Sequence, residues 1–279
     1  MLYTLFRLCF VLMLLCLPTT VSAVEQVETD KWTFSIFAGQ GKIENPVVNL
    51  KDIDTNVFPS ISYYGERFFW EGTTLGYSLL ESDDVIVDLV GLLNEDGLFH
   101  HFEEQEDLTV IDALGFNPSR FPIDGGEVFK PVERDISYLG GISVSVFNDY
   151  FETRLGYFHD LTAVHHGYEI HFSLGRGIET KWFNIYFEAG KVIKSDDLVR
   201  YYYQFQDKEL AFLGGIKDFY TGGQSHNHYY KVELDVPLTD YLSLTGFFKH
   251  THLGNNISKS LLVEDNNYQT SFIGVRYSF

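Results

Sequence analysis

Apolar and polar side chains alternate along many segments of this chain, which is the two-residue period of a β-strand. In residues 228–238, HYYKVELDVPL, every second side chain from Tyr230 to Leu238 is apolar, and the opposite face carries Lys231, Glu233 and Asp235. Segments 136–146, 151–159 and 167–175 show the same pattern. Each segment has about 9 to 11 residues, the length of a tilted strand that crosses a bilayer. The sequence therefore predicts a sheet of membrane-length strands.

The two faces of these strands differ in a way that favours a barrel over a soluble sandwich, which also alternates. The polar faces combine Glu with Arg, Lys or His and are rich in Gly and Ser, which suits a wet, salt-bridged interior. The apolar faces carry Tyr or Phe near the strand ends, as in interfacial girdles, and aromatic residues make up 16% of the chain. Because backbone groups in lipid must all be paired, only a closed sheet can span a membrane. We predict an all-β fold, a transmembrane, antiparallel, up-and-down β-barrel.

The final residues, SFIGVRYSF, continue the alternation to the last position, with Ile273, Val275, Tyr277 and Phe279 on one face. A closed barrel needs its last strand bonded to its first, so we expect this segment to lie in the wall. A terminal aromatic residue is also an insertion signal of outer-membrane barrels, and we expect the barrel assembly machinery to recognise Phe279.

Residues 1–23 have the layout of a secretory signal. Arg7 precedes an apolar run that ends at Pro18, and Val21-Ser22-Ala23 offers a cleavage site. A lipoprotein signal is disfavoured because Leu15, not a small residue, precedes Cys16. We expect cleavage after Ala23, a single barrel domain over residues 24–279, and residence in the bacterial outer membrane. Both cysteines, Cys9 and Cys16, fall in the signal, so the exported domain is expected to lack disulfides.

Acidic residues exceed basic ones, which excludes nucleic acid as a partner attracted by the net field. The formal charge is −19 and becomes more negative by one when Arg7 is removed with the signal. Such a surface suits divalent cations or a basic partner. We expect lipid and lipopolysaccharide to surround the barrel.

Tight turns and long polar stretches indicate where the strands end and on which side of the membrane each connection lies. The reason is that outer-membrane barrels have short periplasmic turns and long outer loops. Asn148-Asp149 and Thr239-Asp240 each join two matched strands, whereas 94–135, 192–225 and 251–267 are long and polar. With the chain end in the periplasm, these three stretches lie outside. The prediction is about twelve strands, in a range of 10–14, at 32–39, 57–64, 66–71, 73–80, 84–93, 136–147, 151–159, 166–175, 182–191, 228–238, 242–250 and the terminal segment.

The segment 57–80 leaves an alternative open. Cutting it into two strands, with a further strand near 209–219, also gives an even count and exchanges the sides of the early loops.

The sequence offers no convincing catalytic set. Ser225, His226 and Asn227 are adjacent, and adjacent side chains on a strand point apart, so they form a poor triad. An omptin-like protease would need paired Asp and Asp-His sets at the outer rim. The single Asp and His residues near the loops do not establish such sets. We predict no enzymatic activity, no cofactor and no metal site.

Two pairs of histidines, His226 with His228 and His250 with His252, are each spaced by two residues. The two members of a pair therefore lie on the same face of one strand. The Thr239-Asp240 turn brings them to the outer end of one hairpin, with 228 near 251. Imidazoles so placed suit Zn, Cu or Ni. The interpretation we favour is that they decorate the interfacial girdle. His100-His101 and His165-His166 are interpreted as loop residues.

Residues 94–112 form an acidic segment, and we interpret them as a solvated outer surface. Contact with lipopolysaccharide through divalent cations is the second interpretation. The acidic residues are Glu95, Asp96, Glu103, Glu104, Glu106, Asp107 and Asp112.

Several stretches resemble the MltA-interacting protein family, also called MipA/OmpV. They are Tyr201-Tyr202-Tyr203 through Glu209, Tyr220 to Gly223 leading into 230–236, 238–244, LGNNISKSLLV at 253–263, the terminal GVRYSF and, more loosely, FPSISYYGERFFWEG at 58–72. One departure is Ser260-Leu261, where the family tends to have Ser-Pro.

The resemblance implies an outer-membrane barrel without catalytic residues. It further implies a scaffold that holds a murein hydrolase, a lytic transglycosylase, near a peptidoglycan synthase. The alternative function is a small-solute or ion channel of the porin type. The two differ in whether the lumen is open or plugged by loops and by paired charges on residues such as Glu152, Arg154, Glu169 and Glu233.

Overall fold

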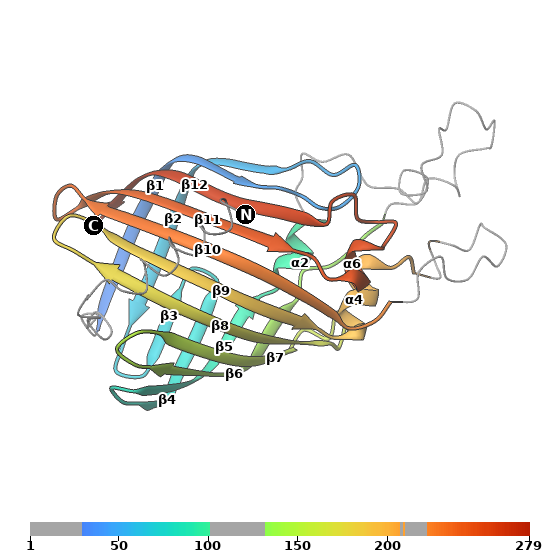
Figure 1. The fold of residues 1–279 in the computed structure, drawn as a ribbon, viewed down its shortest axis with the longest axis horizontal. Coiled ribbons are helices and arrows are strands. Elements are labelled where there is room, and N and C mark those ends of the chain that lie inside the picture. The colour runs from blue at the N-terminus through green and yellow to red at the C-terminus, as the bar shows by residue number, and fades with distance from the viewer. Residues whose placement is uncertain (1–29, 101–131, 207–208, 210–221) are drawn as a thin grey trace, which may run out of the picture.

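The computed structural model describes residues 30–100, 132–206, 209 and 222–279, and it shows an all-antiparallel closed barrel of twelve strands (Figure 1). Consecutive strands are neighbours all the way round. The strands are β1 (Lys31–Ile43), β2 (Ile53–Tyr64), β3 (Phe68–Glu71), β4 (Thr74–Glu81), β5 (Val85–Leu93), β6 (Tyr138–Phe147), β7 (Glu152–Asp160), β8 (Tyr168–Glu179), β9 (Asn184–Lys194), β10 (Ser225–Pro237), β11 (Leu242–His252) and β12 (Asn267–Ser278). The predicted fold class is confirmed. The predicted signal, 1–23, lies outside the described residues and stays a prediction.

The barrel closes between the first and last strands, as the terminal alternation predicted. β12 pairs with β1 from Ser35 opposite Ser278 to Ile43 opposite Thr270. The Phe279 amide donates a further hydrogen bond to the Phe34 carbonyl at 2.8 Å. The last residue therefore belongs to the wall.

The division of 57–80 into three strands is confirmed, because β2, β3 and β4 follow one another in the ring. β1 and β2 begin or end several residues beyond the predicted bounds. A register shift between Ala38 and Gly41 interrupts the period-two pattern there, so the alternation ends before the strands do. The alternative strand at 209–219 lies, apart from Glu209, outside the described residues.

The two faces of the wall have the predicted character. Outward side chains are apolar and exposed to the surroundings of the barrel, for example Ile142, Leu155, Phe172, Tyr230 and Ile273. Inward side chains are polar and buried, among them Ser143, Ser145, Glu169, Ser173 and Glu188. This alternation matches a barrel in lipid with a polar interior.

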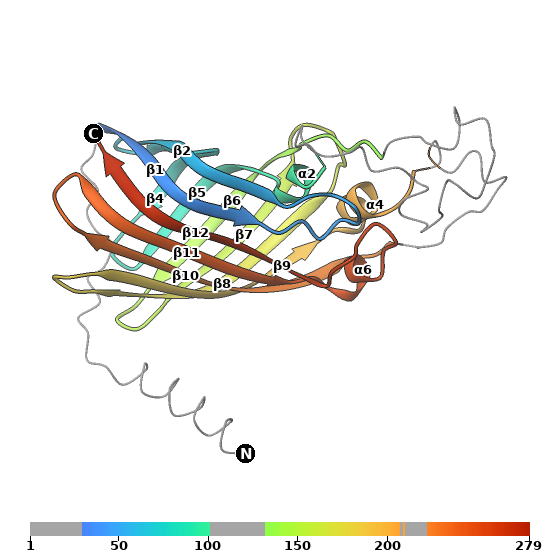
Figure 2. The same ribbon diagram turned by 90° about the horizontal axis from the view of Figure 1, so that it is seen from above.

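Short turns lie at one end of the barrel and long connections at the other (Figure 2). The Asn148 and Thr239 turns close as predicted, with hydrogen bonds from the Asn148 amide to the Phe151 carbonyl and from the Thr239 amide to the Leu242 carbonyl. We call the end with these turns and Phe279 the turn end, and the other end the loop end. Among the described residues, helices α2 (Glu95–Leu98), α4 (Asp196–Tyr203) and α6 (Asn255–Ser258) lie at the loop end. None of the helices in the described part of the chain is both long and apolar enough to cross a membrane.

Candidate functional site: a capped lumen with paired charges

An apolar core fills the loop end of the barrel. Helix α4 supplies Leu198, Val199, Tyr202 and Tyr203, all of which are fully buried. They pack with side chains of four other segments, namely Val47, Phe99, Val132, Leu253, Ile257 and Leu262. We call α2, α4, α6 and the described residues that pack with them the cap, and it lies at the mouth of the lumen (Figure 2).

The sequence SDDLVRYYY explains why α4 forms inside a polar stretch. The Ser195 side chain caps the helix by accepting a hydrogen bond from the Leu198 amide, and Asp196 and Asp197 occupy the first turn. Carboxylates at this position interact favourably with the helix dipole. The buried side chains have helical spacing, so one face of α4 turns into the mouth.

A buried ion pair joins the segment that precedes β6 to Glu209, which follows α4 in the chain. The Arg134 guanidinium donates to both carboxylate oxygens of Glu209, at 2.6 and 3.1 Å, and both side chains are at most 1% exposed. Arg134 also donates to the Gln204 carbonyl at 2.8 Å and lies over the Tyr201 ring. Bidentate pairing of this kind fixes geometry as well as charge.

A second charge cluster joins the cap to the barrel wall. The Lys194 ammonium on β9 lies 2.5 Å from an Asp96 carboxylate oxygen on α2 and 3.5 Å from a Glu169 oxygen on β8. The Tyr203 hydroxyl donates to the other Asp96 oxygen at 2.6 Å. His171 and Asn94 contact Glu169 as well, at 2.6 and 3.2 Å. We call Lys194, Asp96 and Glu169 the Lys194 cluster.

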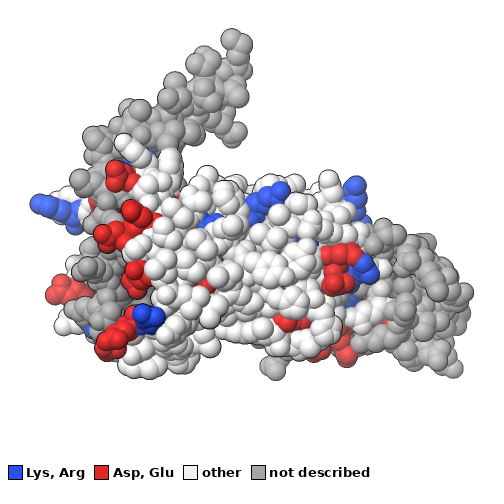
Figure 3. Space-filling model, turned by 90° about the horizontal axis from the view of Figure 1, so that it is seen from below, with Lys and Arg blue, Asp and Glu red and all other residues white. Residues whose placement is uncertain are grey.

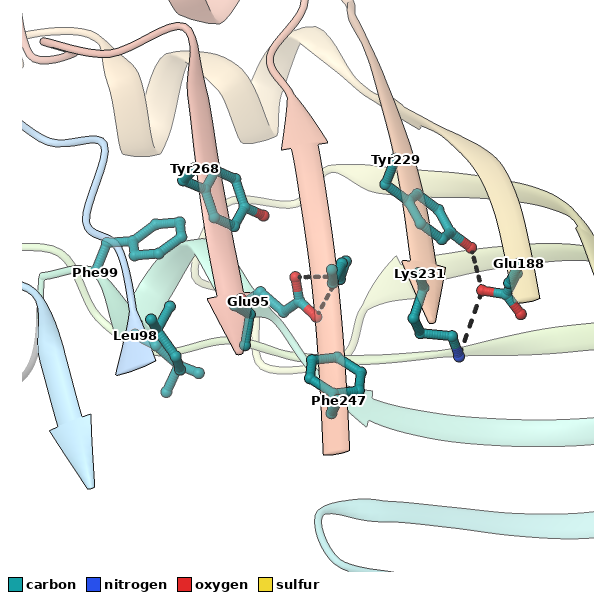
Figure 4. Close-up of a pocket in the computed structure, with 11 residues that line it drawn as sticks. Glu95, Leu98, Phe99, Glu188, Tyr229, Lys231, Phe247 and Tyr268 are labelled. Atoms are coloured by element: carbon teal, nitrogen blue, oxygen red, sulfur yellow. Dashed lines mark hydrogen bonds and ion pairs between the residues drawn. The ribbon is translucent and has the colours of Figure 1, made fainter. Parts of the chain in front are cut away.

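Further ion pairs line the lumen below the cap. Lys249 contacts both oxygens of Glu95 at 3.0 Å, and this ammonium lowers the pKa of Glu95. Figure 4 shows Tyr229 and Lys231 reaching Glu188, at 2.8 and 3.6 Å. These pairs surround a cavity of about 330 Å³ that Leu98, Phe99 and Phe247 also line. A second cavity, of about 430 Å³, extends from the Lys194 cluster to the wall at Thr73 and Leu93.

The residues named as lumen-lining are placed as predicted, and they are paired. Arg154 contacts Glu152 at 2.5 Å, and Lys231 contacts Glu233 at 3.2 Å. Near the turn end Arg276 contacts Asp235 at 3.0 Å. The lumen of the described residues is therefore crossed by matched charges rather than lined by one sign.

The interpretation of the acidic segment as a solvated outer surface is wrong for Asp96, which is buried, whereas Glu95 keeps an exposed side chain but turns it toward the lumen. The Asn94 side chain accepts a hydrogen bond from the Asp96 amide and begins α2, which turns the chain into the mouth. Asp96 is 2% exposed in the Lys194 cluster, and Glu95 points to Lys249. Each acid has its own inward lysine as a partner, Lys194 for Asp96 and Lys249 for Glu95, and the local sequence does not reveal these partners. The other acids of the segment lie outside the described residues.

The four histidines lie on the outer surface at the loop end of the β10–β11 hairpin. His228 is opposite His252 and Tyr230 opposite His250, a shift of one residue from the predicted pairing. The His250 ring stacks on Tyr230, and His252 hydrogen-bonds Asn267 at 2.8 Å. In the described parts of the chain, no three His, Cys, Asp or Glu side chains gather as metal ligands. This placement supports the girdle interpretation.

The other residues considered for chemistry are separated by the wall. Ser225 and Asn227 are buried on the inner face and bond each other at 3.0 Å, whereas His226 is exposed on the outer face. His165 lies in the β7–β8 connection as predicted, but it is buried and hydrogen-bonds Ser137 at 3.0 Å. His101 lies outside the described residues.

Acid should weaken the cap. Burial and the nearby Arg134 lower the pKa of His100 to about 3, and burial also lowers the pKa of His165. An unfolded histidine binds its proton near pH 6.5, so stability is lost as the pH falls below that value. Between pH 7 and pH 5, His100 alone should cost about 2 kcal/mol. Hydrogen exchange of α4 amides at both pH values measures this effect, and His100→Phe should remove most of the difference. Equal protection of α4 at pH 7 and pH 5 would contradict the prediction.

Most of the chain matches one known protein family. The family described as "MltA-interacting protein MipA" matches residues 43–279. The chain belongs to this family. A curated relative, the outer membrane protein Omp26La of Vibrio anguillarum, is 26% identical over 233 residues, covering 82% of this chain and 81% of the relative.

Similar solved structures are outer-membrane barrels. A loop-deletion mutant of Vibrio cholerae OmpT has a TM-score of 0.37 and 8% identity, and the match covers 81% of this chain and 64% of that one. The anion-selective porin of Comamonas acidovorans has a TM-score of 0.35 and 8% identity, with 89% and 99% covered. The family match, the named outer-membrane relative and the closed antiparallel wall together show that this MipA-family protein is an outer-membrane β-barrel, in agreement with the predicted family, fold class and location.

Proposed function

We propose that this MipA-family protein is a structural scaffold, whose plugged barrel anchors murein-processing enzymes at the outer membrane. The observation that carries the proposal is the cap, in which apolar packing and buried ion pairs hold α2 and α4 across the mouth. A diffusion pore gains nothing from a mouth held in this way. The name of the family supports the murein enzyme as partner.

The turn end is the surface we assign to the partner. The described turns expose more acidic than basic side chains, and Figure 3 shows acidic groups gathered at this end, beyond an almost uncharged belt. The acidic residues are Glu66, Glu81, Asp83, Asp84, Asp149, Glu179 and Asp240, and the basic ones are Arg67 and Lys181. Trp182 stands among them at 78% exposure. This combination fits a basic partner surface with an apolar anchoring point.

Site-specific photocrosslinking in intact envelopes tests the scaffold. A photoreactive residue at Trp182 should capture a murein lytic transglycosylase, and one at Leu261, exposed at the loop end, should not. Absence of any murein enzyme from the Trp182 adducts would overturn the proposal.

The alternative, a small-solute or ion channel, is favoured by the two lumen cavities. Planar-bilayer recording separates it from the scaffold. The scaffold proposal expects no steady open conductance from the wild-type protein. A steady, ion-selective conductance would favour the channel instead.

Labelling on whole cells should show which end faces outward. Lys259 and Asp240 are both exposed, at the loop end and the turn end respectively. In a chain whose own cysteines lie in the predicted signal, Lys259→Cys should react with an impermeant maleimide. Asp240→Cys should react only after the outer membrane is opened. The reverse result would place the cap, not the turns, on the periplasmic side where murein enzymes work.

A further inference from the structure

The β3–β4 hairpin is much shorter than the strands on either side of it. β2 pairs with β1 along its whole length but with β3 only at Ser62–Tyr64. In the described residues, positions 53–60 of β2 have no ladder partner on the β3 side. At about 3.4 Å per residue this free edge is about 27 Å long. β5 likewise extends past β4, because Leu92 and Leu93 pair only with β6.

The free edge of β2 has features of a permanent edge. The Gly72 amide donates to the Ile61 carbonyl at 3.0 Å, so the Ile61 backbone faces the β3 side. Backbone direction alternates along a strand, so Pro59 and Val57 face that side as well. Proline has no amide hydrogen to leave unpaired, and the Val57 carbonyl accepts a bond from the Thr55 hydroxyl at 3.4 Å. The proline and the hydrogen bond to the Val57 carbonyl also disfavour pairing of this edge with a strand of another protein.

The tip of the short hairpin is fixed in the middle of the wall. Gly72 adopts a φ of 55°, which a tight turn requires, and the Trp70 indole donates to the Gly72 carbonyl at 2.6 Å. The Tyr138 hydroxyl donates to the Thr73 carbonyl at 3.1 Å. The Tyr138 ring reaches the tip by crossing Gly91, where a Cβ atom would come within 2.7 Å of it. The gap above the tip is therefore bounded by an ordered structure.

The larger lumen cavity reaches this gap. It has a volume of about 430 Å³, and its lining includes Thr73 and Thr74 at the hairpin tip and Leu92 and Leu93 at the end of β5. Leu98, Val192 and Tyr268 line it farther in. Its charged side chains are already paired in the Lys194 cluster and by the contact between Lys249 and Glu95. Such a cavity suits an apolar chain with an uncharged polar group that hydroxyls can bind.

The gap lies within the membrane. The hairpin rises by four residues on the β3 side and by eight on the β4 side, about 13 and 26 Å along the strands, or about 10 and 20 Å in height after tilting, against an apolar band about 25 Å tall. Only molecules that dissolve in the lipid reach an opening at this level.

We propose that the opening between the free edge of β2 and the end of β5 is a lateral port. Through it a single-chain amphipathic molecule with an uncharged head group enters the lumen cavity from the membrane. We call this opening the lateral port. The inference does not depend on the scaffold function, because a plugged mouth leaves the wall opening intact.

Photolabelling with a twelve-carbon alcohol that carries a diazirine tests the port. Wild-type protein in lipid vesicles should form adducts at Leu92 or Leu98, which line the cavity, and excess unlabelled 1-dodecanol should suppress them at least tenfold. Adducts confined to outward residues such as Ile142, with no suppression, would overturn the proposal.

A blocking variant tests the route. Leu93→Trp should reduce adducts at Leu98 at least tenfold. Leu89→Trp is the matched control, because Leu89 shares the outer face of β5 but lies where the wall is paired on both sides. Unchanged Leu98 labelling in folded Leu93→Trp would show entry through the mouth and refute the lateral route. Leu93→Phe replaces the tryptophan variant if heat-modifiable migration shows that the latter does not fold. Crosslinks between β2 edges of two copies would instead assign the opening to self-association.

Discussion

Replacing Lys194 by methionine should lower the free energy of unfolding by about 3–5 kcal/mol, the usual cost of removing one partner from a buried ion pair. Asp96 and Glu169 are 2% and 4% exposed, so neither carboxylate can recover its hydration without moving. The loss concerns both the wall and the cap, because the cluster joins α2 to β8 and β9. Urea unfolding in lipid vesicles, followed by the heat-modifiable band, gives the difference.

Two variants make the test specific. Lys191→Met changes an outward residue of the same strand, opposite His228 in the girdle, and should not lower stability, because an outward lysine near the interface costs about 0–1 kcal/mol that methionine removes. The triple variant Lys194→Met, Asp96→Asn, Glu169→Gln removes the charges together and should recover most of the loss. If Lys194→Met unfolds at the same urea concentration as the wild type, the cluster does not hold the cap.

The second large effect is expected at the Arg134–Glu209 pair. Glu209→Gln leaves a buried guanidinium without its counter-charge, at a cost of about 3–5 kcal/mol. The loss of stability concerns the cap, because Arg134 also donates a hydrogen bond to the Gln204 carbonyl at the end of α4. Hydrogen exchange of the α4 amides should become at least a hundredfold faster, because about 1.4 kcal/mol corresponds to a factor of ten.

A control lies in the same helix. Arg200 pairs with Asp196 on the exposed side of α4, and exposed pairs contribute about 0–1 kcal/mol. Arg200→Gln should therefore change α4 exchange less than about fivefold. If both variants leave α4 equally protected, the Arg134–Glu209 pair does not secure the cap. Bilayer recording on Glu209→Gln would also show whether a loosened cap admits ions.

The wall of the barrel could be predicted because the polarity of each strand residue matches the medium that its side chain meets. Tyr230 and Leu155 meet lipid and Arg154 and Glu169 meet the lumen, so the period of two is visible locally. The tight turns at Asn148 and Thr239 mark the ends of their strands. The prediction lost strand bounds where a bulge interrupts the period between Ala38 and Gly41, and it also ended β8 four residues early, ended β9 three residues early and began β10 three residues late.

The cap could not be predicted in the same way. The alternation pattern shows only a long polar stretch over 192–225, although Ser195 followed by Asp196 and Asp197 is a helix start signal within it. α2 and α6 have four residues each, too few to show a helical period. Val47, Phe99 and Leu262 come from separate loops, and nothing in the chain order indicates that they meet.

The sequence by itself determined the closed antiparallel wall and its two faces, because lipid on one side and water on the other impose a pattern on consecutive residues. The choice of three strands in 57–80, and with it the count of twelve, needed the pairing of β2, β3 and β4. Only the tertiary structure decided which charges neutralise one another. Lys194 meets Asp96 across 98 positions, and Arg134 meets Glu209 across 75. Only the tertiary structure, too, showed that the short β3–β4 hairpin leaves an opening beside a lumen cavity. Loop folding and strand stagger bring distant residues together, and such contacts leave no period in the sequence.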